Sequence, residues 1–166
     1  MYAASWLSHL ASADCPSEDV LQALLQRAQE LQQGTSRHRH LLHGKRLGLM
    51  SSNPEDEDAQ LFKRAALELA AHVSILPAPA VNRGGQFPQL ADIGRLLGRL
   101  YDAVECQGVA ADTVSRMAQA NNIPMLAGLA GREHWVAQLA QRWRTTAPLQ
   151  DRRRWLIQAV LLASFG

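Results

Sequence analysis

The segment RLGLMSSNPEDEDAQLFKRAALELAAHVSIL, residues 46–76, contains the pattern that decides the fold of this chain. Residues 47–51 form an apolar run of strand length, residues 59–71 place apolar side chains at helical spacing, and residues 72–76 again have the length and composition of a strand. A strand, a helix and a second strand in close succession predict a βαβ unit. The two strands of such a unit lie parallel in one sheet.

The same alternation of helices and strands continues on both sides of this segment. It predicts an α/β protein built as a three-layer sandwich, in which a four-stranded parallel sheet has helices on both faces. Length and composition favour a single domain comprising residues 1–166, since 47% of the residues are hydrophobic. The further helices are expected at 18–31, 93–100, 109–121, 133–144 and 149–165, and the further strands at 103–106 and 124–129.

The overall charge of the chain is nearly balanced, with a formal net charge of +2. This balance does not favour nucleic acid or an anionic membrane surface as a partner. No run of about 18 consecutive apolar residues is present, and Cys15 and Cys106 are too few for a disulfide framework or a cysteine metal site. We therefore expect a cytoplasmic protein that has no cofactor or bound metal, spans no membrane and binds no nucleic acid.

Residues 51–62, SSNPEDEDAQLF, lie where the first strand of the βαβ unit ends and its helix begins. In parallel sheets, ligands bind at the carboxyl ends of the strands, next to the N-termini of the following helices. No GxGxxG follows the first strand and no GxxxxGK[ST] occurs in the chain, so the common dinucleotide and P-loop nucleotide sites are not predicted. The ligand class has to be inferred from other residues.

Four consecutive acids, Glu55 to Asp58, precede the apolar part of this helix. We favour a structural interpretation, in which Asn53 caps the helix, Pro54 occupies its first turn, and the acids meet the positive end of the helix dipole. Two alternatives remain open. Asp56 and Asp58 with a neighbouring residue can hold a divalent cation, or the acidic block can be a docking surface for a basic partner.

Several longer stretches resemble the aspartate and ornithine carbamoyltransferase family, most closely its ornithine branch. LLHGKRLGLM at 41–50 is similar to that family's run into its first strand, and IGRLLGRLYDAVECQG at 93–108 is similar to its helix and strand that end in YRG. IPMLAGL at 123–129, followed by His134, resembles VPVWNGL and HPTQ. The resemblance covers nearly the whole chain and implies the fold of the family's first domain, which binds carbamoyl phosphate.

The end of the chain resembles a different part of the same family. DRRRWLIQAVLLASFG at 151–166 is similar to the family's final helix, ENRMHTIKAVMVATLG, which follows the second domain and returns to pack on the first. The resemblance therefore implies a first-domain-like part at 1–145 and a returning helix at 149–166, with the amino-acid-binding second domain missing. That helix is expected to pack through its apolar residues Trp155, Leu156 and Val160.

The phosphate-binding motif of the family, STRTR, is replaced in this chain. Residues 55–59 stand on its five positions, so the two positive charges of the motif have become four negative ones. Like charges about 4 Å apart repel by roughly 4 kcal/mol at a surface-like dielectric before screening, so carbamoyl phosphate should be repelled. Gln107 stands where YRG has its arginine, and of HPTQ only His134 is in register. The degenerate phosphate-site positions are Glu55, Asp56, Glu57, Asp58, Ala59, Gln107 and His134.

His134 has an inherited interpretation as a group that polarises a carbonyl or contacts phosphate, and a plain one as a residue near the start of the penultimate helix. We favour the plain interpretation, because the arginine and threonine partners of the motif are absent. No paired base or nucleophile stands at a recognisable spacing, so no catalytic residue is assigned. A displaced anion site formed by Arg83, Arg95 and Arg99 remains a further option.

Two other groups of residues have a structural and a functional interpretation. The histidines at 38, 40 and 43 lie among basic residues, and we favour a solvated connector over a metal or nucleic-acid site, because no aromatic residues are interspersed. The tryptophans at 135, 143 and 155 are expected in the core, with a protein interface as the alternative.

The sequence thus predicts a catalytically degenerate carbamoyltransferase-like protein of amino-acid metabolism that acts as an oligomerising or regulatory partner. A homotrimer or a separate protein would cover the surface left by the missing domain. One alternative is a binder or enzyme for a cationic small molecule, selected by the acidic block in the old cleft. The other is residual carbamoyl transfer in a complex that supplies the missing residues.

Overall fold

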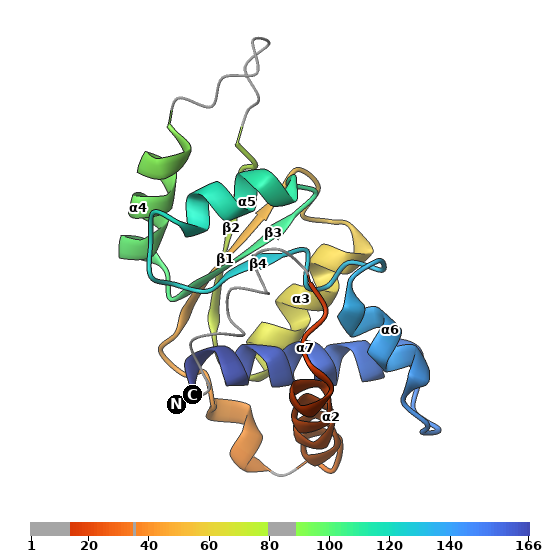
Figure 1. The fold of residues 1–166 in the computed structure, drawn as a ribbon. Helices are drawn as coiled ribbons and strands as arrows, with labels where there is room; N and C mark the ends of the chain where they lie inside the picture. The colour runs from red at the N-terminus through yellow and green to blue at the C-terminus, as the bar shows by residue number, and fades with distance from the viewer. Residues whose placement is uncertain (1–13, 35, 80–88) are drawn as a thin grey trace.

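The computed structural model describes residues 14–34, 36–79 and 89–166, and a parallel four-stranded sheet lies in them between two layers of helices (Figure 1). The spatial order of the strands is β2-β1-β3-β4. Leu47 of β1 pairs with Val73 of β2 on one side and with Ala103 of β3 on the other. The predicted α/β sandwich is confirmed. The strands are β1 (Arg46–Ser51), β2 (His72–Leu76), β3 (Ala103–Gln107) and β4 (Met125–Ala127).

The larger helical layer covers one face of the sheet and holds most of the hydrophobic core. Leu49 and Leu126 of the sheet, Phe62 of the second helix and Ile157 of the last are all fully buried in this core. Figure 1 shows the last helix crossing the others of this layer. The layer consists of α2 (Glu18–Gln32), α3 (Glu57–Glu68), α6 (Trp135–Arg142) and α7 (Leu149–Phe165), with the 3₁₀ helix η1 (Ser36–His40) between α2 and β1.

Helix α7 has the bounds expected from its apolar spacing and packs against α2, α3 and α6. Leu156 and Val160 are fully buried, whereas Trp155 keeps part of its ring at the surface. Trp135 and Trp143 are also buried, so the core interpretation is confirmed for these two rings. The helix therefore completes the core on this side of the sheet.

The smaller layer consists of α4 (Leu90–Leu100) and α5 (Ala111–Ala118), which cover the other face (Figure 1). A side chain at Gly94 would place its Cβ 2.3 Å from the carbonyl oxygen of Met117, so the glycine permits close packing of the two helices. Helix α4 buries Leu90, Gly94 and Leu97. Leu96 and Leu100, which share the predicted apolar spacing, are 55% and 45% exposed.

The start of α3 differs from the expectation that Asn53 caps it. The N-cap residue is Asp56, because residues 53–56 form a turn in which the Asn53 carbonyl accepts from the Asp56 N–H at 3.1 Å. The helix also ends at Glu68 rather than at Ala71, since Ala70 adopts the left-handed φ of 63°. Capping by Asn53 was therefore wrong, whereas the acids of the block do lie at the N-terminus of the helix.

Candidate functional site

The carboxyl ends of β1, β3 and β4 lie at one edge of the parallel sheet, where the sequence places the degenerate phosphate-site positions. Strand β1 ends at Ser51, and α3 begins with Glu57 after the connecting residues 52–56. Strand β3 ends at Gln107. The topology thus brings the acidic block, Gln107 and the connection from β4 to α6 toward one region of the molecule.

Three residues of the acidic block are exposed, and two of the four, Glu57 and Asp58, have side-chain partners. Glu57 forms an ion pair with Arg132 and accepts a hydrogen bond from Gln150. Glu55 and Asp56 are exposed and form no ion pair with any residue that the structure describes. Ala59, which stands on the fifth motif position, is fully buried. Only part of the block is therefore free to contact a ligand.

Asp58 is the inward member of the block, and its partner comes from the last helix. Nη2 of Arg153 donates to Oδ1 of Asp58 at 2.8 Å and to the carbonyl oxygen of Ala130 at 2.5 Å. Nη1 of Arg153 faces Oε1 of Gln150 at 3.4 Å. The arginine side chain is only 6% exposed and that of Asp58 20%. A buried guanidinium therefore neutralises the acidic residue that stands at the N-terminal end of α3.

Glu105 on β3 is a buried acid that the sequence interpretation missed. Its Oε1 accepts from the Ala130 N–H at 3.3 Å and from Nε2 of Gln107 at 3.4 Å, while Oε2 is buried without a partner among the described residues. Burial raises the pKa of this carboxyl from 4.5 to about 8, against backbone hydrogen bonds from Leu129 and Ala130 that lower the pKa. A charged residue inside the apolar run AVEC was the signal that could have found it.

Gln107 is also buried, and its amide is turned toward Glu105. The side chain that stands at the family's arginine position therefore serves an internal hydrogen bond. Both residues are on the face of β3 that carries Ala103, because side chains two residues apart on a strand share a face. That face lies under α3 and α7.

His134 is the N-cap residue of α6. Its Nδ1 accepts from the Val136 N–H at 3.2 Å, so the ring proton belongs on Nε2, which is buried and has no acceptor in the part of the chain that the structure describes. Burial lowers the pKa of the imidazole to about 4, and the side chain is neutral at pH 7. It borders an open hollow of about 410 Å³ together with Gly128, Gly131 and Arg132. The imidazole is therefore a neutral helix cap whose single N–H is buried.

The described residues include only two of the three arginines of the displaced anion site. Arg83 lies outside them. Arg95 is exposed on α4, where it pairs with Asp92 of the same helix, and Arg99 is exposed on the same helix. Helix α4 covers the opposite face of the sheet from α3 (Figure 1). The displaced anion site therefore stays a prediction, and its two described arginines lie on the other side of the sheet from the acidic block.

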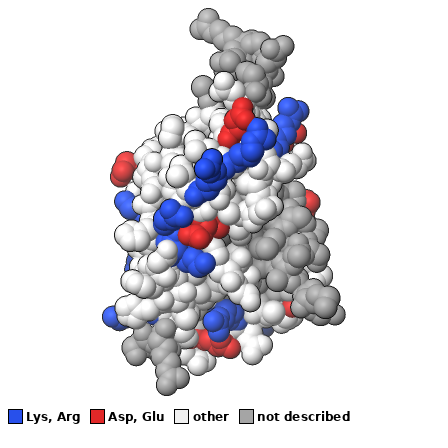
Figure 2. Space-filling view, turned by 90° about the vertical axis from the view of Figure 1, so that its left-hand side faces the viewer, with Lys and Arg blue, Asp and Glu red and all other residues white. Residues whose placement is uncertain are grey.

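Charges of both signs are mixed on the surface. Figure 2 shows basic side chains in a broken row with acidic side chains between them. At the start of β1, for example, Lys45 and Arg46 both lie 4.0 Å from the carboxylate of Asp102. Among the described residues, no group of three or more His, Cys, Asp or Glu side chains is placed to hold a metal ion, and no helix is long and apolar enough to cross a membrane.

Comparison with known proteins gives one consistent relationship. No family model matches the chain. The catabolic ornithine carbamoyltransferase of Bacillus licheniformis is 30% identical over 136 residues, which are 80% of this chain and 40% of that protein. The chain is homologous to ornithine carbamoyltransferases. It spans about 40% of the length of the curated relatives it matches, so the homology concerns one part of those proteins.

Solved structures support the same relationship. The ornithine carbamoyltransferase of Thermus thermophilus superposes with a TM-score of 0.65 and 26% identity, over 80% of this chain and 46% of that one. The enzyme of Gloeobacter violaceus gives a TM-score of 0.61 and 28% identity, over 80% of this chain and 42% of that one. The homology to ornithine carbamoyltransferases is therefore seen in both sequence and fold.

Proposed function

We propose that this homologue of ornithine carbamoyltransferases does not transfer carbamoyl groups, because its own ion pairs occupy the position where the family binds phosphate. One observation carries the proposal. At the N-terminus of α3, the buried Arg153 guanidinium pairs with Asp58 and with the Ala130 carbonyl. The chain then serves as a regulatory or assembly partner in amino-acid metabolism.

Electrostatics support this proposal. A phosphate at the start of α3 would face the carboxylates of residues 55–58, and each like-charge pair costs free energy. Arg153 cannot offset this repulsion by binding the phosphate unless it leaves Asp58. Breaking a buried ion pair costs about 3–5 kcal/mol. The dianion would thus have to displace a neutralised acid before it gained any new contact.

The chemistry around His134 also supports it. A neutral imidazole with one N–H can donate a hydrogen bond to a carbonyl but adds no positive charge. The arginine that would accompany it is replaced by Gln107, which is hydrogen-bonded to Glu105. Only residues 143–148 connect α6 to α7, so a second domain that could hold an acceptor does not lie between them. Positioning of two reactants, a main source of catalysis, would be lost.

The test is calorimetric titration with carbamoyl phosphate at low salt, alongside inorganic phosphate, ornithine and calcium. We expect no heat of binding from either anion at concentrations where a carbamoyltransferase is saturated. Micromolar binding of carbamoyl phosphate that is lost in His134→Asn, with citrulline formed from added ornithine, would overturn the proposal. Heat from ornithine or calcium that is lost in Glu55→Gln/Asp56→Asn would replace it with a cation-binding function.

Self-association is the assembly role that we propose, with the homotrimer implied by the family resemblance as its form. Leu96 and Leu100 of α4 and Ile75 of the edge strand β2 are exposed apolar side chains that an interface would cover. Sedimentation velocity of the wild type and of Leu96→Ser/Leu100→Ser tests this. We expect a trimer that dissociates in the double variant. Leu67 on α3 is about as exposed as Leu96 and Leu100, and Leu67→Ser should leave the trimer unchanged. A monomeric wild type would exclude it.

A further inference from the structure

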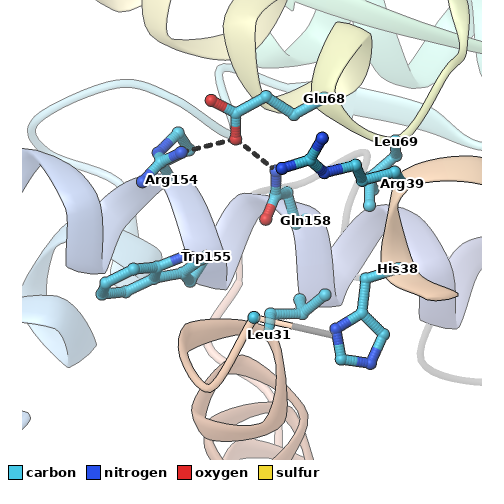
Figure 3. Close-up of a pocket in the computed structure, with 9 residues that line it drawn as sticks. Leu31, His38, Arg39, Glu68, Leu69, Arg154, Trp155 and Gln158 are labelled. Atoms are coloured by element: carbon cyan, nitrogen blue, oxygen red, sulfur yellow. Dashed lines mark hydrogen bonds and ion pairs between the residues drawn. The ribbon is translucent and has the colours of Figure 1, made fainter. Parts of the chain in front are cut away.

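A second hollow lies at the other end of α3, away from the carboxyl ends of the strands. It has a volume of about 660 Å³ and is bordered by α2, η1, α3 and α7 (Figure 3). That volume is within the usual range of small-molecule sites, about 300–1,000 Å³. Helix α3 has 12 residues and is therefore about 18 Å long, so this pocket is separate from the region of Asp58 and His134. Its lining includes Leu31, Arg39, Glu68, Leu69, Trp155 and Gln158.

Gln158 of α7 offers a fixed hydrogen-bond acceptor in this pocket. The residue is 4% exposed, and its Nε2 donates to the Ala65 carbonyl at 3.1 Å and to Oε2 of Glu68 at 3.0 Å. Both partners are acceptors only, so the amide cannot be turned the other way. Its Oε1 has no partner among the described residues, and Figure 3 shows that oxygen on the side that faces Leu31 and Trp155. A ligand with an N–H or O–H group would complete this amide.

Glu68, by contrast, is already paired with two guanidinium groups and one amide. Its carboxylate accepts from Nε of Arg64 at 3.1 Å, from Nη1 of Arg154 and from Nε2 of Gln158. The other terminal nitrogen of Arg154 pairs with Asp151 at 2.8 Å. The negative charge within the pocket is therefore already neutralised by the protein.

Arg39 supplies the charge that is not neutralised. It lies on η1, is exposed, and forms no ion pair with the described residues. Figure 3 shows its side chain extending from η1 across the pocket toward α7. A guanidinium with free donors favours a carboxylate, which it can bind through two parallel hydrogen bonds.

The remaining wall is apolar and partly aromatic. Leu31 and Leu69 are buried beside the pocket, and the Trp155 ring is only half-buried. The ring is held by Trp143, with centroids 6.0 Å apart, and by the Arg154 guanidinium at 5.4 Å. A rigid apolar surface of this kind gains from contact with a hydrocarbon or planar group.

We infer that this pocket binds a small carboxylate monoanion with an apolar body and one N–H or O–H donor. The carboxylate faces Arg39, the donor faces Oε1 of Gln158, and the apolar body contacts Trp155 and Leu31. The inference does not depend on the proposed loss of carbamoyl transfer, because none of these residues belongs to the region of Asp58. Binding here would link η1 to α7 and α3, which suits an effector site.

The test uses three matched probes. N-acetyl-L-leucine has all three features, N-acetyl-L-leucinamide lacks the carboxylate, and 4-methylpentanoate lacks the N–H. Calorimetry and amide chemical shifts of the full chain should show binding of N-acetyl-L-leucine, about tenfold weaker binding of each of the other two, and shifts at residues 38, 39 and 158.

Variants then assign the site. Arg39→Gln should weaken N-acetyl-L-leucine about tenfold and leave the leucinamide unchanged, whereas Arg99→Gln, the same change on α4, should affect neither. Trp155→Leu should weaken all three probes. The inference is overturned by equal affinities for the three probes, by absence of binding at about 10 mM, or by shifts at His134 instead of at Arg39 and Gln158.

Discussion

At the N-terminal end of α3, Asp58 pairs with Arg153 of α7, whereas at the C-terminal end Glu68 pairs with the next residue of α7, Arg154. The two ends therefore use the same kind of contact from one helix. At the first end, the same guanidinium also donates to the Ala130 carbonyl, so it serves two acceptors of the protein itself. At the second, Oε1 of Gln158 has no partner within the described ranges, and the residue lines a hollow of about 660 Å³.

The difference teaches that the number of charges does not define a binding site. The N-terminal end has four acids and looks like a site in the sequence, yet its inward acid is satisfied within the protein. The C-terminal end has one acid, which is also paired, but around it the amide oxygen of Gln158 and the exposed Arg39 have no partner among the described residues. What a cluster can bind depends on which polar atoms are left over after folding.

The largest effect is expected from Arg153→Met. The change leaves Asp58 and the Ala130 carbonyl without their donor inside the protein, and removal of one partner from such a pair costs about 3 kcal/mol. Urea unfolding of the variant measures the loss. Arg116→Met, which removes an exposed ion pair to Asp112 on α5, is the control and should cost less than about 0.5 kcal/mol. Equal losses in the two variants would contradict burial of the Asp58 pair.

The pH dependence of the unfolding free energy should reflect the N-terminal end of α3, because Glu105 accepts from the N–H of Ala130, whose carbonyl is bound by the partner of Asp58. The pKa of Glu105 is about 8 in the folded chain and 4.5 ordinarily, so the unfolded state loses its proton first. The free energy of unfolding therefore falls as the pH rises from 4.5 toward 8, by about 2 kcal/mol between pH 5 and pH 7. Above pH 8 the contribution of Glu105 no longer changes with pH.

Glu105→Gln should remove this part of the slope, because the amide resembles the protonated carboxyl and does not titrate. The measurement is the unfolding free energy of both proteins from pH 5 to pH 7. A parallel pH profile for the two proteins would show that Glu105 ionises normally, for example through water entering near Oε2.

A smaller effect is expected from Arg154→Met at the other end of α3. Glu68 is 35% exposed and keeps hydrogen bonds from Arg64 and Gln158, so the free energy of unfolding should fall by only about 1 kcal/mol. Comparison with Arg153→Met in the same urea series gives the ratio of the two losses in unfolding free energy, one for each end of α3. A loss as large as that of Arg153→Met would mean that the ion pairs at the two ends of α3 are equally shielded from water.

The smallest effect on stability is expected from Arg39→Gln. Its guanidinium has no ion pair with the described residues, so the unfolding free energy should change by less than about 0.5 kcal/mol. The same urea measurement tests this. A loss above about 1 kcal/mol would show that Arg39 is a structural residue and not a spare cation at the pocket.

Much of the fold could be predicted because the decisive signals are local. Strands β1 and β2 and helix α7 follow from apolar runs and apolar spacing within short windows, and their observed bounds agree closely with those expected. The start of α3 could not be predicted in this way. The turn at residues 53–56 depends on which of several polar groups accepts the Asp56 N–H, and periodicity carries no information about that choice.

The sequence by itself determined the alternation of strands and helices, the family resemblance and the acidic block. Only the tertiary structure decided which acids are neutralised, because Asp58 and Arg153 are 95 residues apart in the chain and meet through the packing of α7 on α3. The same holds for the pocket, whose lining comes from α2, η1, α3 and α7. Local spacing fixes which face of an element is apolar, whereas long-range packing selects the polar atoms that remain free to bind.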